Sequence, residues 1–135
     1  VVFEKIHFRE DVKNYGHEDT LLGYDLFRAG IEIFHIDNPL EHTGLEDSVV
    51  FIGKTKTALE SLYLIEKQLL AGDKVFVQQV KFLNRYYNIT QYLPPVLLRL
   101  FYKFSNLFIE RNLKGTNPNL FLFDLYKLGF YATLG

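Results

Sequence analysis

The sequence predicts a mainly α-helical protein of the α+β class, in which a helix and a short strand region precede an antiparallel array of about four helices. Three observations support this fold class. Apolar residues recur at helical spacing through most of residues 48–135, and prolines and glycines separate these runs. Residues 31–37 alternate apolar and polar side chains as a half-buried strand does. With 135 residues and 48% hydrophobic content, the chain can bury a core.

The first predicted helix follows Gly16 and ends at Gly30. Three of its apolar residues recur on one face: Leu22, Leu26 and Ala29. Glu18 and Asp19 lie in its first turn, where the helix dipole stabilises a negative charge by roughly 0.3–1 kcal/mol. An ionised carboxylate is what a general base requires, but acids are also frequent in first turns as capping residues without a chemical role.

The strand prediction covers residues 31–37. Asn38-Pro39 ends it, because proline donates no hydrogen bond to a ladder and restricts the residue before it. A helix and a strand joined by a short turn usually pack side by side. We therefore expect the loop after the strand, which carries His42, to lie near the start of the first helix.

The region after residue 47 predicts four helices that pack antiparallel. The first begins at Ser48 as its N-cap and ends at Gly72. Its buried stripe is predicted at six positions: Phe51, Thr55, Leu59, Leu62, Ile65 and Leu69. Asp73 opens the second helix, which has four apolar or aromatic positions at helical spacing: Phe76, Val80, Leu83 and Tyr87.

The third helix begins at Pro94-Pro95 and ends at Gly115, and the fourth extends from about Pro118 to Tyr131. The third helix has a broad apolar face, formed by Leu97, Leu100, Phe101, Phe104, Leu107 and Phe108. Its polar face is narrower and consists of Arg99, Lys103, Asn106 and Glu110. Together with the aromatic last helix, this pattern fits a helix resting on acidic lipid, or a helix packed against neighbouring parts of the protein.

Charge is distributed unevenly along the chain. Residues 1–47 contain 11 acids and 4 bases, whereas residues 48–135 contain 5 acids and 11 bases. The bases are spread over several helices rather than gathered on one surface, so we do not expect nucleic acid as a partner. Because there is no cysteine, disulfides and thiolate zinc sites are excluded. No apolar stretch reaches the ~18 residues of a membrane span, and no secretory signal is visible.

Two segments carry a resemblance to a known family: residues 15–20 (YGHEDT) and residues 36–46 (IDNPLEHTGLE). With their flanking residues they cover about a third of the chain, and they resemble the C-terminal portion of bacterial glycosyltransferase family 2 enzymes, which have the glycosyltransferase-A fold. The resemblance implies inverting transfer of a sugar from a nucleotide sugar to an acceptor hydroxyl. It also implies that a glycan or lipid-linked acceptor is the second substrate.

The resemblance implies a role for each site residue. Asp19 corresponds to the base that deprotonates the acceptor, and Glu18 to its catalytic neighbour, which orients the acceptor. His17 and Tyr15 are the expected acceptor-binding residues. His42 matches a position that, in several relatives, helps an Asp-x-Asp motif to hold a divalent metal, Mg or Mn, against the diphosphate.

The chain also departs from the family pattern. Its aspartates stand at positions 11, 19, 25, 37, 47, 73 and 124, and no two are separated by one residue, so there is no Asp-x-Asp motif. A glycine-rich phosphate loop is missing as well. We therefore expect a truncated glycosyltransferase-A fold that lacks its nucleotide-binding half, with an acceptor and catalytic segment at residues 1–47 and a helical region at 48–135. Such a fragment is expected to hold no metal and to be inactive alone.

Two alternatives to the transferase are open at this point. One is a non-catalytic helical module for association with a membrane surface or a protein. The other is a metallohydrolase using Glu18, Asp19 and His42, which is thinly supported because further histidines are not at hand. The expected location is the cytoplasm, including the inner face of the membrane for a peripheral protein.

Overall fold

The computed structural model describes residues 6, 16–34, 36–41, 44 and 46–135, and this part of the chain is mainly helical, as predicted. It contains six α-helices and one π-helical segment, η2, which continues α2. Their bounds are α1 Glu18–Arg28, α2 Ser48–Leu64, η2 Ile65–Leu69, α3 Lys74–Gln79, α4 Lys81–Thr90, α5 Pro95–Leu113 and α6 Leu120–Thr133.

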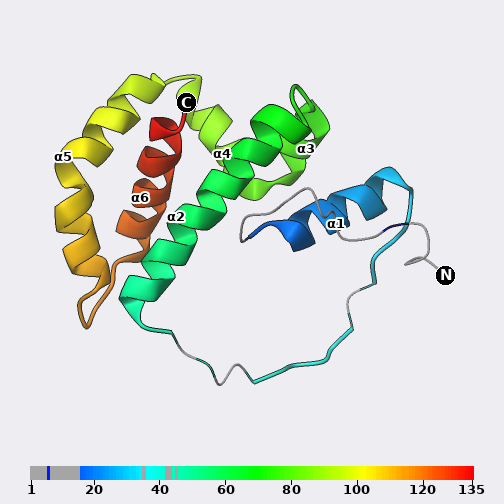
Figure 1. Ribbon diagram of the computed structural model, residues 1–135, viewed down its shortest axis with the longest axis horizontal. Helices are drawn as coiled ribbons and strands as arrows, with labels where there is room; N and C mark the ends of the chain where they lie inside the picture. Colours follow the sequence, from blue (N-terminus) through cyan, green and yellow to red (C-terminus); the bar gives the residue numbers. More distant parts are fainter. Residues whose placement is uncertain (1–5, 7–15, 35, 42–43, 45) are drawn as a thin grey trace.

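Helix α6 lies between α5 and α2 (Figure 1). Helices α5 and α6 are antiparallel and adjoin one side of α2, whereas α1 lies on the other side of α2. Helices α3 and α4 close the end of the array where α2 and η2 finish. A long connection leads from α1 to the start of α2, so the first helix and the helical array are separate in sequence but packed together in space.

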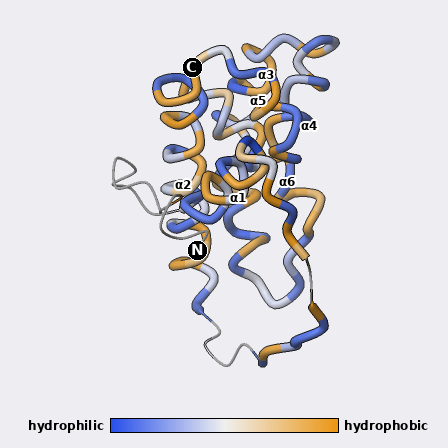
Figure 2. Tube along the Cα trace, turned by 90° about the vertical axis from the view of Figure 1, so that its right-hand side faces the viewer, coloured by the Kyte–Doolittle hydropathy of each residue, from blue (hydrophilic) through white to orange (hydrophobic). Residues whose placement is uncertain are grey.

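The predicted strand at residues 31–37 is wrong for the residues that the structure describes, because 31–34 and 36–37 have no strand conformation. Hydrophobic and hydrophilic residues do follow each other along this connection (Figure 2). However, Phe34 and Ile36 are 78% and 80% exposed, and no second strand is found in the described part of the chain. Alternation alone does not form a strand, because a ladder needs a partner to supply its hydrogen bonds.

The buried face of α1 differs from the predicted one. Leu21 and Tyr24 are buried, and the three residues predicted for that face are half-buried or exposed: Leu22, Leu26 and Ala29. The reason is tertiary. Tyr24 donates a hydrogen bond from its hydroxyl to Asp73, and its ring meets Phe76 edge-on at a centroid distance of 5.2 Å. These two contacts orient α1 on the array. The position of α3 therefore decides which face of α1 is buried.

Side chains cap three helices at their N-termini. Asp47, rather than the predicted Ser48, caps α2 by accepting a hydrogen bond from the backbone N–H of Val49. Asp73 caps α3, as predicted, by accepting from two backbone N–H groups. Asn119 caps α6 in the same way. The short aspartate and asparagine side chains thus determine where these helices start.

The predicted second helix of the array is divided into α3 and α4 at Val80. This residue is extended, with ψ at 103°, and its carbonyl accepts the first hydrogen bond of α4, from Asn84. A β-branched residue tolerates such an extended conformation well. The change of direction allows Phe76 on α3 and Leu83 on α4 both to be fully buried.

The core surrounds α6. Five residues of this helix are buried: Tyr126, Leu128, Gly129, Tyr131 and Ala132. Leu59, Leu62 and Ile65 of the predicted α2 stripe are buried too, but Phe51 is half exposed. Helices α5 and α6 approach closely at Gly129, since a Cβ there would lie 2.8 Å from the Cβ of Tyr102 and 3.2 Å from the Leu98 carbonyl oxygen.

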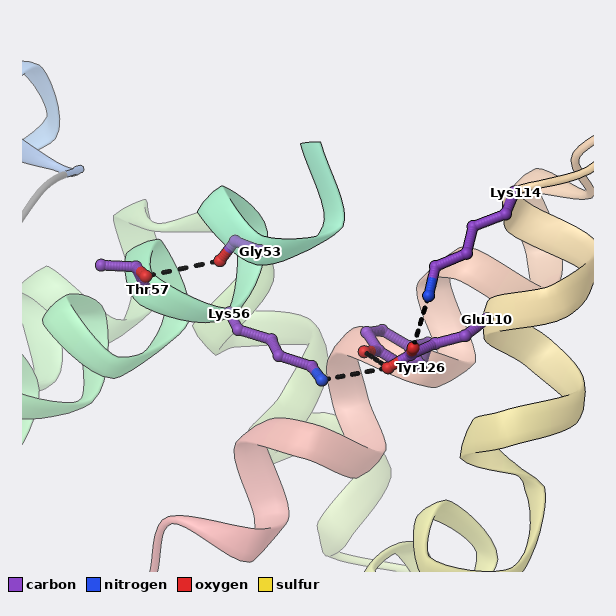
Figure 3. A network of polar contacts seen from close by, with 6 residues as sticks. All are labelled: Gly53, Lys56, Thr57, Glu110, Lys114 and Tyr126. Atoms are coloured by element: carbon purple, nitrogen blue, oxygen red, sulfur yellow. Dashed lines mark hydrogen bonds and ion pairs between the residues drawn. The ribbon is translucent and has the colours of Figure 1, made fainter. Parts of the chain in front are cut away.

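Glu110 joins three helices through its carboxylate (Figure 3). Its Oε1 accepts hydrogen bonds from Tyr126 of α6 at 2.6 Å and from Lys56 of α2 at 3.0 Å, and its Oε2 accepts from Lys114 at 3.0 Å. Burial alone would raise the pKa of Glu110, but these three donors outweigh it and lower the pKa to about 2. The carboxylate is therefore ionised at neutral pH and binds α2, α5 and α6 together.

Glu66 makes a second junction at the other end of α6. Its Oε2 accepts a hydrogen bond from Tyr131 at 2.7 Å, and its Oε1 accepts from Tyr87 and, at 2.9 Å, from Lys67. Burial opposes ionisation, but the donors hold the pKa of Glu66 below its usual value. Both buried tyrosines of α6 thus have a carboxylate partner.

Replacing Gly129 by alanine should lower the free energy of unfolding by roughly 1–3 kcal/mol, because the added methyl group collides with α5. Gly53→Ala is the matched control. It lies within α2 with nothing within 4 Å of the added Cβ, and should stabilise the protein by about 0.5–1 kcal/mol through helix propensity. Urea unfolding of the two variants checks both signs. Equal stability of Gly129→Ala and the wild type would contradict the close approach of α5 and α6.

Glu110→Gln should lower stability by roughly 1–3 kcal/mol at pH 7, since it removes the charge that Lys56 and Lys114 face. The folded-state pKa of Glu110 is about 2, below the unfolded value of 4.5, so its stabilisation is complete above pH 4.5 and is lost as the pH falls towards 2. The variant and the wild type should therefore converge in stability near pH 2. Thermal unfolding between pH 2 and 7 measures this, with the exposed Glu60→Gln as a control that changes stability by less than about 0.5 kcal/mol.

Candidate functional site

Three of the five predicted site residues lie together at the start of α1. His17 precedes the helix as its N-cap residue, and Glu18 and Asp19 form its first turn. The other two, Tyr15 and His42, lie outside the described residues. The structure therefore gives the geometry of the acidic pair and of the histidine beside it.

The backbone before α1 forms a left-handed turn. Gly16 has a φ of 102° and His17 a φ of 71°. A left-handed conformation costs a residue with a side chain roughly 1–2 kcal/mol, although histidine adopts it more readily than most. A Cβ at Gly16 would lie 2.8 Å from the Cβ of Ala58, so the turn is packed directly on α2. Only glycine fits at position 16, and α2 holds the turn in place.

The two acids play different parts in this turn. Both carboxylate oxygens of Glu18 accept the backbone N–H of Gly16, at 3.1 and 3.2 Å, so Glu18 stabilises the turn. Asp19 is exposed, and its Oδ1 accepts the backbone N–H of Thr20 at 2.7 Å. The carboxylate of Asp19 is therefore held at the helix N-terminus while remaining accessible to a ligand.

The imidazole of His17 is half-buried beside the acids. Its Nδ1 lies 3.2 Å from the hydroxyl oxygen of Thr20, which fixes the ring orientation. Burial lowers the pKa of His17, and this effect outweighs the opposite influence of Asp19 and Glu18. The ring is thus neutral at pH 7, and a neutral imidazole can both donate and accept a hydrogen bond.

A pocket of about 560 Å³ between η2, α3 and α4, lined by many polar residues, was not predicted from the sequence. The ion pair of Glu66 and Lys67, at 2.9 Å, forms part of its wall. Four amide side chains also line it: Gln78, Asn84, Asn88 and Gln91. Three of the four recur at helical spacing along or just after α4. This spacing was the sign in the sequence that could have indicated the pocket. Asp73, the partner of Tyr24, also lines the pocket, so α1 is anchored at its edge.

The described residues do not fit a divalent metal site. Within residues 16–34, 36–41, 44 and 46–135, no group of three or more histidine, aspartate or glutamate side chains is placed to hold a metal ion. The acids at the start of α1 are engaged instead with backbone N–H groups.

Comparisons with protein-family models, curated proteins and solved structures find no match to this chain. The candidate site is consequently described by its own geometry: an exposed aspartate at a helix N-terminus, a neutral histidine, and a left-handed turn braced by Glu18 and Ala58.

Proposed function

We propose that this chain forms the acceptor side of an inverting glycosyltransferase, as the C-terminal portion of a family 2 enzyme with the glycosyltransferase-A fold. In this proposal Asp19 is the base that deprotonates the acceptor hydroxyl, and His17 binds the acceptor beside it. The observation that supports the proposal most is the left-handed turn at Gly16 and His17, which Glu18 and Ala58 brace and which leaves Asp19 exposed.

The strain in this turn supports a functional role better than a capping role. Serine, asparagine or aspartate at the N-cap position can cap a helix without a left-handed backbone conformation. Here His17 is in that conformation and its side chain makes no hydrogen bond that caps α1. Strained residues persist where the surroundings hold them, and they are concentrated at functional sites.

In the proposed reaction, the Asp19 carboxylate accepts the proton of the acceptor hydroxyl while the hydroxyl oxygen attacks the anomeric carbon of the nucleotide sugar. The bond from this carbon to the diphosphate oxygen breaks, and the nucleoside diphosphate leaves with the electron pair. A single displacement inverts the configuration at the anomeric carbon. The products are the glycoside, the nucleoside diphosphate and a protonated Asp19.

In this proposal, residues other than those described in the structure bind the nucleotide-sugar donor. The sequence contains no Asp-x-Asp motif, and the net charge of −7 over residues 1–47 repels a diphosphate. We therefore assign nucleotide-sugar and metal binding to a separate, donor-binding half. The role of this chain is to position the acceptor and to take up its proton.

The second candidate function is a non-catalytic helical module for association with a membrane surface or a protein. A specific observation favours it, namely the exposed apolar side chains along α5, among which Phe104 and Leu107 are 82% and 81% exposed. The two functions are compatible, because α1 and α5 lie on opposite sides of α2 (Figure 1).

Asp19→Asn tests the transferase proposal in the enzyme that combines this chain with a donor-binding half. Loss of the base should lower kcat by roughly 10²–10⁴-fold, and the affinity for the nucleotide sugar should change less than about twofold. Glu60→Gln, which removes an exposed carboxylate from α2, should leave both unchanged. Steady-state kinetics with a nucleotide-binding titration measure these effects, and near-normal kcat in Asp19→Asn would exclude Asp19 as the base.

The isolated chain provides a further test, because we expect it to bind acceptor but not donor. In an NMR titration, acceptor saccharides should shift the amide signals of residues 16–20, and His17→Ala should weaken that binding. Nucleotide sugars, with or without Mg or Mn, should shift none of them. Sugar transfer by the purified chain alone would contradict this division of roles.

A further inference from the structure

Helix α5 exposes its apolar face rather than burying it. Seven apolar side chains along the helix are 39–82% exposed: Val96, Leu97, Leu100, Phe101, Phe104, Leu107 and Phe108. They recur at spacings of three and four residues and so form one continuous stripe along the helix. In the described part of the chain, no other segment covers this stripe.

The opposite face of α5 packs inward although it contains more polar groups. Arg99 donates a hydrogen bond from Nε to the carbonyl of Ala132 at 2.6 Å, and Glu110 binds Lys56 and Tyr126. Three apolar residues complete this inner face: Leu98, Ile109 and Leu113. Helix α5 therefore has all of its internal partners on one side, and the apolar stripe on the other side is free for an external one.

The end of α5 lies near the starts of α6 and α2 (Figure 1). Five further apolar side chains in the first turns of α6 and α2 are at least half exposed: Leu120, Phe121, Val49, Val50 and Phe51. The two first turns are in contact, since the rings of Phe51 and Phe123 lie 5.6 Å apart. An exposed apolar surface that extends over three helices is typical of a protein or membrane contact.

The charges around the stripe favour a negatively charged partner. Lys103 and Arg111 are exposed on the same face, at helical spacing from Leu107. The only acid of α5, Glu110, faces inward and is neutralised by Lys56 and Lys114. Helix α1, which begins with Glu18 and Asp19, lies on the far side of α2 from α5 (Figure 1). An anionic surface approaching α5 thus meets bases and apolar groups, and the acids nearest to it, at the start of α2, are engaged: Asp47 caps the helix and Glu46 pairs with Lys54.

We propose that the outer face of α5, with the first turns of α6 and α2, binds the surface of an anionic membrane. The helix lies parallel to the bilayer, its apolar stripe enters the headgroup region, and Lys103 and Arg111 contact the lipid phosphates. No helix among the described residues is both long and apolar enough to cross a bilayer, so this contact is interfacial. A second copy of the chain fits less well, because pairing two α5 stripes brings four bases together.

Vesicle sedimentation tests the proposal with the full chain. We expect the protein to sediment with vesicles of 30% phosphatidylserine in phosphatidylcholine and to remain largely in the supernatant with pure phosphatidylcholine. Raising the salt from 50 to 500 mM should weaken binding to the anionic vesicles, because it screens the bases. Equal binding to neutral vesicles, or a dimer on size-exclusion chromatography without any vesicle binding, would overturn the proposal.

Two paired variants separate the apolar and the electrostatic contributions. Phe104→Gln with Leu107→Gln should lower binding to the anionic vesicles at least about tenfold, since it removes the most exposed apolar groups. Lys103→Gln with Arg111→Gln should lower it roughly thirtyfold, at about fivefold for each base. The matched control, Lys74→Gln with Lys81→Gln, removes two exposed bases from α3 and α4 and should change binding less than about twofold.

Each variant is first compared with the wild type by far-UV circular dichroism, which should be unchanged because all six side chains are exposed. If the control pair weakens binding as much as the α5 pair, the attraction is a general effect of net charge, and the assignment to α5 is wrong. Loss of vesicle binding in the α5 variants leaves the role of Asp19 untouched. The membrane contact and the transferase activity can therefore fail independently.

Discussion

The structure depends on burying α6 without leaving its two buried tyrosine hydroxyls unpaired. An unpaired hydroxyl in a core costs about 1–3 kcal/mol. Tyr126 donates to Glu110 of α5, and Tyr131 donates to Glu66 of η2. Each carboxylate in turn needs cations and donors, which Lys56, Lys67 and their neighbours supply. The positions of α2, α4 and α5 around α6 follow from these two ionised junctions.

The same requirement explains the unusual orientation of α5. Because Glu110 has to reach Tyr126, the side of α5 that contains Glu110, Leu98 and Ile109 faces inward, and the apolar stripe from Val96 to Phe108 faces outward. On the far side of α2, the contact between Tyr24 and Asp73 anchors α1, and the Gly16 turn rests on Ala58. The packing therefore separates two surfaces: a polar one, with an exposed carboxylate at a helix N-terminus, and a basic, apolar one suited to lipid. This separation is compatible with both proposals, an acceptor site at the start of α1 and a membrane contact at α5.

The candidate site combines structural and chemical roles in adjacent residues. Glu18 is occupied by the turn that it stabilises, whereas Asp19 remains accessible at the dipole of α1. The sequence indicated both acids and their place in the first turn. It did not distinguish their roles, because the difference arises from the left-handed backbone of Gly16 and His17, which α2 holds in place. The pocket between η2, α3 and α4 was not predicted either, since its walls come from three segments that tertiary packing brings together.

The sequence by itself determined the helical class and most helix boundaries, because these depend on local features. Asp73 caps α3, Pro95 opens α5, and Gly30 and Gly72 follow helical segments with φ near +70°, as residues of their type do at helix ends. Only the tertiary structure decided which face of each helix is buried. A stripe of phenylalanine and leucine predicts contact with an apolar environment, but it does not say whether that environment is the core or an external surface. The face of α5 that contains Glu110 packs inward, because its ionised carboxylate accepts hydrogen bonds from a buried tyrosine and two lysines. The apolar stripe could not provide such an acceptor.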